Sequence, residues 1–284
     1  MSRTDQALRR ASLNIGGVLI TVVYLGVFIV LPFGGIVFSA VRDGIGTFAQ
    51  NLARPETGEA LRLSISVTVA ALLVNIVFGV AAAWLIARFR FPGRELLRSL
   101  LNLPLSISPV IVGLLFILML GRNSRFGGWL ESAIGVQVIF AWPGLFLVTL
   151  FISFPYVVRE LLPVLSSLGS EEEEAAITLG ASGLATFIRV TLPNIRFALL
   201  YGITLSAARA VGEYGAVSVV SGLLRGRTVT LPIQVQIFYA EYMSGAAFAA
   251  ATIFFGFGVI TLISKTLLEG KLRDLPKPEG VNQS

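Results

Sequence analysis

Long runs of apolar residues without a charged side chain dominate the chain. An α-helix rises about 1.5 Å per residue, so about 20 apolar residues cross the hydrocarbon core of a bilayer. Five runs exceed this length, and a sixth is interrupted only by Arg209 and Glu213. The pattern therefore predicts six transmembrane helices, over residues 11–41, 63–87, 99–121, 132–158, 197–224 and 242–264.

The composition agrees with this pattern. Hydrophobic residues make up 55% of the chain and charged residues 13%, with a mean hydropathy of +0.83, whereas a soluble domain carries about 25% charged residues. We therefore expect an all-α integral membrane protein. The first apolar run is too long for the core of a cleavable signal peptide and is interpreted as an uncleaved anchor. The expected division is an N-terminal segment (1–12), a transmembrane domain (13–268) and a tail (269–284).

Positive charge is distributed unevenly between the loops. If the N-terminus is cytoplasmic, lysine and arginine favour the cytoplasmic side by about two to one, as the positive-inside rule requires. This places the N- and C-termini and the 160–196 loop in the cytoplasm. The bias also explains the sequence pI of about 10.1 better than nucleic-acid binding does, so no nucleic-acid partner is expected.

The residue inventory argues against intramembrane catalysis. The chain has no cysteine and no histidine, which removes thiolate chemistry and the usual zinc and haem ligands. Its aspartates, Asp5, Asp43 and Asp274, lie outside the predicted spans. We expect no catalytic residue, no metal site and no cofactor in this chain.

The 160–196 loop is the one substantial connection. Ser170 and Glu173 have the spacing of a capping box, so a helix is expected to begin there, run to about Leu179 and stop at Gly180. Ser182 is expected to cap a second short helix that ends before Pro193. Two interpretations remain open from loop chemistry alone: a surface helix packed on its own membrane domain, or a docking element for a cytoplasmic partner.

A motif within this loop carries a resemblance. Glu174-Ala175-Ala176 is followed by Gly180 and then by Val190-Thr191-Leu192-Pro193, which is similar to the E-A-A, G, I-x-L-P signature of ABC importer permeases. In that family the projection is a coupling helix that sits in a groove of the ATPase subunit. The resemblance implies ATPase-coupling roles for Glu174, Ala175, Ala176, Gly180, Leu192 and Pro193.

Further stretches, at 81–94, 103–116, 186–202 and 208–222, resemble the sulfate/thiosulfate branch and its W-type permease subunit. Molybdate and tungstate permeases share much of this pattern. The resemblance implies a bacterial inner-membrane location among lipid, two ATPase copies, a second permease chain of the related T type and an extracytoplasmic sulfate-binding protein. The chain has no G-x-x-x-x-G-K-[ST] motif, so ATP and Mg²⁺ would be bound by the ATPase.

Several polar residues are candidates for an anion pathway. Arg209 and Glu213 fall near the middle of a predicted span at helical i, i+4 spacing, so they are expected to pair. The pair either only holds the helix bundle together or forms a gate in which the arginine partly faces the anion. Ser106, Ser108 and Ser218 either satisfy a kinked backbone or donate to anion oxygens.

A transporter that works without an ATPase is the alternative from another class. It predicts inverted repeats and helices broken near the membrane midplane. No repeat is evident in the sequence, and this alternative leaves the E-A-A loop unexplained.

Overall fold

The computed structural model describes residues 17–273, and within that range every regular element is a helix. The first helical stretch runs over Gly17–Val41 and includes the first two of the named elements. In chain order, the named elements are η1 (Gly26–Val30), α2 (Leu31–Val41), α3 (Ile45–Leu52), α4 (Pro55–Arg88), α5 (Arg94–Leu100), α6 (Leu103–Ser106), α7 (Pro109–Leu120), α8 (Arg125–Ile134), α9 (Trp142–Ser167), α10 (Glu171–Thr178), α11 (Gly183–Thr186), η2 (Phe187–Thr191), α12 (Leu192–Val211), α13 (Gly215–Ser221), α14 (Leu231–Ala240) and α15 (Ser244–Arg273).

Five of these helical stretches are long and apolar enough to cross a membrane: Gly17–Val41, Pro55–Arg88, Trp142–Ser167, Gly183–Val211 and Ser244–Leu268. A bent pair, Arg94–Ser106 with Pro109–Leu120, makes a sixth if it is counted as one span. The all-α membrane fold is thereby confirmed, while the cytoplasmic placement of the termini remains a prediction. The expected N-terminal segment and residues 274–284 of the expected tail lie outside the described residues.

The third span is broken, where the sequence suggested at most a kink. The two halves of the bent pair meet at 110°. Ile107 and Ser108 are extended, with ψ of 138° and 133°, directly before Pro109. A residue that precedes proline is disfavoured in the helical region because the proline ring clashes with it, so the helix stops and a new one begins.

The fifth span differs most from its prediction. The helix does not end before Pro193 but continues from Gly183 to Val211. A π-helical turn, closed by a bond from the Leu192 N–H to the Phe187 carbonyl, immediately precedes the proline. Because proline donates no N–H and a π turn is wider than an α turn, the chain passes through this point without breaking. At its other end the helix stops at Val211, short of residue 224, and α13 follows separately.

The fourth span is also shifted. Residues 132–134 belong to α8, which Gly135 ends with a φ of 70°. Helix α9 starts at Trp142 and continues past the exposed Arg159 to Ser167.

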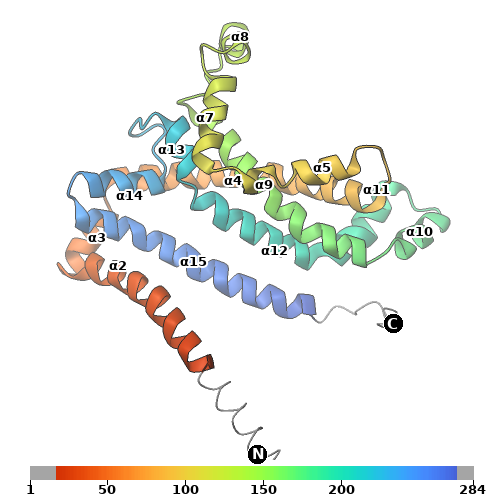
Figure 1. Ribbon diagram of the computed structural model, residues 1–284, viewed down its shortest axis with the longest axis horizontal. Helices are drawn as coiled ribbons and strands as arrows, with labels where there is room; N and C mark the ends of the chain where they lie inside the picture. The colour runs from red at the N-terminus through yellow and green to blue at the C-terminus, as the bar shows by residue number, and fades with distance from the viewer. Residues whose placement is uncertain (1–16, 274–284) are drawn as a thin grey trace, which may run out of the picture.

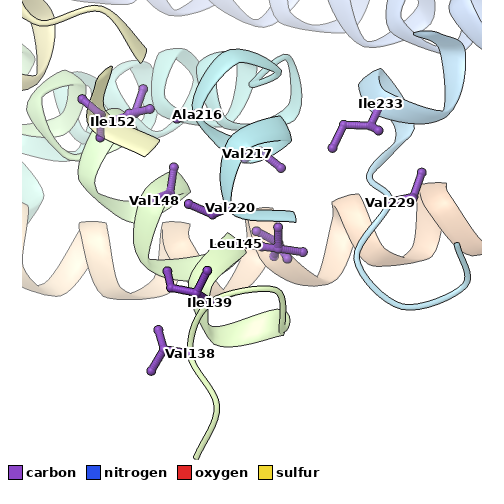
Figure 2. Close-up of a cluster of buried hydrophobic side chains, with 12 residues drawn as sticks. Val138, Ile139, Leu145, Val148, Ile152, Ala216, Val217, Val220, Val229 and Ile233 are labelled. Carbon is purple, nitrogen blue, oxygen red and sulfur yellow. The ribbon is translucent and has the colours of Figure 1, made fainter. Parts of the chain in front are cut away.

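The helices pack through small residues and three clusters of buried apolar side chains. A Cβ added at Gly79 of α4 would lie 2.9 Å from the Val157 Cγ1 of α9, and one at Gly202 of α12 would lie 3.2 Å from the Val157 Cα. Figure 2 shows buried side chains of α9 facing those of α13, where they join Val67 and Val112 from α4 and α7 in one cluster. In Figure 1, α10 and α11 lie at one end of the long helices, α3 and α14 at the other, and α7 and α8 project sideways.

The contact at Gly79 makes a first prediction. Replacing Gly79 with valine is expected to force α4 and α9 apart, and overpacking of this kind costs about 1–3 kcal/mol. Gly256→Val is the matched control, because a Cβ there meets no atom within 4 Å. Thermal aggregation of the full chain in detergent measures the difference. Equal midpoints for the two variants would contradict the packing described here.

Candidate coupling loop and candidate anion pathway

The 160–196 loop forms a helical projection at one end of the molecule (Figure 1). Its first helix, α10, carries four glutamates in its first turn, where negative charge complements the helix dipole. Gly180 follows with a φ of 88°, a conformation that favours glycine. The Ser182 side chain then accepts a bond from the Ala185 N–H at 3.3 Å and caps α11. The expected stop at Gly180 and cap at Ser182 are confirmed.

The expected capping box at Ser170 and Glu173 is wrong. The Ser170 hydroxyl donates instead to Glu174 Oε1 at 2.5 Å. The Glu173 carboxylate turns toward the membrane domain, where it accepts bonds from Arg88 and from the Thr191 hydroxyl at 2.8 Å. A two-pronged bond to a guanidinium is stronger than a bond to a neutral backbone N–H, which accounts for the difference.

Arg88 lies at the centre of a polar cluster beneath the projection. Its Nε and Nη2 donate to the two Glu173 oxygens at 2.9 and 3.0 Å, and its Nη1 donates to the Leu165 carbonyl at 2.7 Å. The side chains of Arg88 and Glu173 are only 12% and 14% exposed. Nearby, the Asn194 amide donates to Glu172 Oε2 at 2.5 Å. The sequence carries no signal for this cluster, because Arg88 and Glu173 lie 85 residues apart and Arg88 is only one of the positive charges on the predicted cytoplasmic side.

The structure divides the predicted coupling residues between two places. Glu174, Ala175 and Gly180 are exposed on the projection, whereas Leu192 and Pro193 lie in the long helix behind it. Large apolar side chains surround the exposed group, and Leu179 is 89% exposed. Exposed apolar patches of this kind mark interaction surfaces. The further exposed large apolar residues of the loop are Leu168, Ile177, Leu184 and Ile188.

The expected pair of Arg209 and Glu213 is present, but in a different setting. Arg209 Nη1 lies 2.5 Å from Glu213 Oε2, and the Glu213 side chain is 2% exposed. The chain leaves the helix between them, at Gly212, so the pair bridges a helix end rather than spanning one helical face. Glu213 Oε1 also accepts a 2.8 Å bond from the Ala216 N–H at the start of α13.

The break in the third span meets the break after α12. A Cβ at Gly215 would lie 3.1 Å from the Pro109 Cβ, and one at Gly113 would lie 2.8 Å from the Ala216 carbonyl. Ser108 precedes Pro109 and is exposed, so it lies at the edge of this junction. Two adjoining broken helices are typical of substrate pathways in transporters.

The other serine candidates have local partners. The Ser218 hydroxyl donates to the Gly215 carbonyl at 2.9 Å. Ser106 is exposed on α6 and donates to the Asn102 carbonyl at 3.5 Å. The pathway roles of all three serines, and of Arg209 and Glu213, remain predictions.

Comparisons with known proteins give a consistent result. Residues 75–274 match the family model described as the inner membrane component of binding-protein-dependent transport systems. The chain is 48% identical, over 249 residues, to the sulfate transport system permease protein CysW of Escherichia coli K12, which covers 88% of this chain and 85% of that protein. It is 46% identical to CysW of Synechococcus elongatus, covering 89% and 88%, and 31% identical to the E. coli sulfate permease protein CysT, covering 88% and 90%.

Solved structures share the fold. A bacterial ABC transporter that imports the acidic polysaccharide alginate superposes with a TM-score of 0.75 at 18% identity, over 97% of this chain and all of that one. A second structure of an alginate transporter, in complex with its alginate-bound periplasmic protein, gives 0.76 at 18% identity, over 94% and 97%.

The two bonds of Glu213 generate a prediction about stability. Glu213→Ala removes both the ion pair and the α13 cap and leaves Arg209 without this partner, a change that typically costs about 3–5 kcal/mol. Glu213→Gln is expected to cost less, because its amide oxygen still accepts from Ala216. Glu131→Gln, in a largely exposed pair with Arg122, is the control and should cost at most about 1 kcal/mol. Thermal midpoints in detergent test this order, and a Gln variant as unstable as the Ala variant would contradict it.

Proposed function

The chain belongs to the family of inner membrane components of binding-protein-dependent transport systems, the permeases of ABC importers, and we propose that it moves sulfate or thiosulfate into the cytoplasm. One observation carries the choice of anion. The identity of 48% to a protein named as a sulfate transport permease extends over 88% of this chain. An identity this high over nearly the whole chain includes both the coupling loop and the broken helices.

The projection of α10 and α11 is, in this proposal, the surface that the ATPase contacts. Glu174 anchors it, small Ala175 and Ala176 permit a close approach, and Gly180 sets the turn. The exposed apolar side chains around them, above all Leu179, support an interface with another protein. Leu192 and Pro193 lie where the projection passes into the membrane helix. ATP and Mg²⁺ are bound by the ATPase, since this sequence has no P-loop motif.

The transport cycle follows from this placement. ATP binding draws two such projections together and opens the pathway outward, and hydrolysis restores the inward-facing state. The junction of the two broken helices, with Arg209, Glu213, Ser108 and Ser218 around it, is the proposed pathway. An oxyanion there needs polar groups that replace its water, and irregular backbone within a membrane domain supplies such groups.

Four partners complete the proposed assembly. Two ATPase copies sit at the coupling projections, a T-type permease forms the other half of the pathway, and an extracytoplasmic binding protein delivers the anion. The likeness to CysT supports a related second chain. The alginate transporter solved with its periplasmic protein supports the delivery step. The family description, an inner membrane component, supports a location of the assembly in the bacterial inner membrane.

Two alternatives to an ATP-driven sulfate importer differ from it in different ways. A molybdate or tungstate permease would keep the same machinery and change only the cargo. A transporter without an ATPase predicts broken helices, and the structure has one bent pair, Arg94–Ser106 with Pro109–Leu120, so that feature does not discriminate. Family membership and the exposed E-A-A projection favour the ATP-driven importer.

Uptake of labelled sulfate by cells that lack this chain tests the proposal. The native chain is expected to restore uptake with little competition from molybdate. Glu174→Arg places the wrong charge at the ATPase contact, which costs about 2–5 kcal/mol, so uptake should fall about tenfold or more.

Glu95→Arg makes the same charge change on α5, outside the coupling loop, and is expected to leave uptake nearly native. Full uptake with Glu174→Arg would show that Glu174 has no coupling role. Uptake of molybdate but not of sulfate would support an ATP-driven importer with a different substrate.

A further inference from the structure

Arg88 has more protein contacts than a topology charge requires. An arginine that only satisfies the positive-inside rule can extend into water or lipid headgroups. Arg88 is instead nearly buried, and three of its N–H groups donate to protein oxygens. These oxygens belong to two other segments, Leu165 in α9 and Glu173 in α10.

Helix α10 depends on such contacts for its position. It contains eight residues, none of them buried, and its first turn is entirely acidic. An isolated helix this short is unstable in water. Its side chains reach the rest of the molecule through Glu173, bound to Arg88 and Thr191, and Glu172, bound to Asn194.

We propose that Arg88 is a positioning residue that locks α10 to the ends of α4 and α9, so that these helices move as one body when the ATPase moves α10. The proposal rests on the proposed function, because it needs an ATPase at the projection. Arg88 touches neither the anion nor ATP in this account. It acts through Glu173, and Thr191 holds the same carboxylate from the η2 side.

The chemistry suits a mechanical link. An arginine fork that binds both oxygens of a carboxylate fixes distance and orientation together, which a single point charge does not. Arg88 also holds a main-chain carbonyl of α9 with a third N–H. A pull on Glu173 is therefore transmitted to two membrane helices at once. If the link is lost, the ATPase can still close, but α4 and α9 no longer follow α10 closely.

The complete importer, reconstituted in proteoliposomes with its ATPase, second permease and binding protein, tests the link. ATP hydrolysis and sulfate uptake are measured together, and the readout is ATP consumed per sulfate moved. Coupling between sites typically amounts to about five- to 150-fold, so Arg88→Gln is expected to raise this ratio at least about fivefold. Arg88→Lys keeps the charge but not the fork, and an intermediate ratio is expected.

Arg98→Gln is the matched control. Arg98 pairs with Glu95 within α5, and the two side chains are 39% and 73% exposed, against 12% for Arg88. The substitution removes the same charge on the same predicted side of the membrane, and its ratio should stay native. A native ratio in an assembled Arg88→Gln importer would overturn the proposal.

A second variant keeps the proposal testable if Arg88→Gln does not assemble. Thr191→Val preserves side-chain shape and removes only the hydroxyl bond to Glu173, and a raised ratio is expected here too. A native ratio for this variant, or failure of every variant to assemble, would overturn the positioning role. If the native importer takes up no sulfate, the proposed substrate is wrong. That result is obtained from the native importer alone, so it is distinct from any effect of the Arg88 variants.

Discussion

The rule that no backbone polar group can remain unpaired in hydrocarbon governs this architecture. Intact helices satisfy it by themselves, and the interruptions require substitutes. At the break after α12, the Glu213 carboxylate accepts the Ala216 N–H. Beyond α13, the Ser221 hydroxyl accepts the Leu223 N–H, and Thr228 Oγ1 accepts that of Leu224. These two departures from helix are thus held by named side chains, which satisfy backbone N–H groups that the helices leave unpaired.

One continuous helix connects the projection with the junction of the broken helices. From Gly183 to Val211 the chain starts in the coupling projection, passes through the π turn and Pro193, and ends beside the Arg209–Glu213 pair. Had the helix ended before Pro193, as the sequence suggested, the projection and the pathway would be joined by a flexible loop. A continuous helix carries displacement along its axis, so in the proposed coupling the π turn matters because it preserves the helix.

Part of the fold could be predicted from local chemistry, and the remaining features depend on tertiary contacts. Charge-free runs located α4 and α15 because hydrocarbon imposes one requirement on every residue. The turn at Gly180 was readable because few residues adopt its φ. The effect of each proline on its helix was not predictable from the sequence. Pro109 begins a new helix after a 110° bend, whereas Pro155 and Pro193 lie inside helices. Which outcome a proline produces depends on neighbours distant in sequence. For the same reason the Arg88–Glu173 contact, which joins residues 85 positions apart, had no sequence signal.

Two ion pairs with little-exposed side chains lie at opposite ends of the proposed transmission path. The Arg88–Glu173 pair binds α10 of the projection to α4, and the Arg209–Glu213 pair bridges the end of α12 at the junction of the broken helices. Burying an ion pair contributes little net stability compared with apolar residues of similar volume, because both charges lose their water. Stability therefore does not explain well why either pair is present. Directional bonds that fix one geometry explain it better, because in the proposed coupling a motion of α10 reaches the pathway only if the contacts between helices hold their relative orientation.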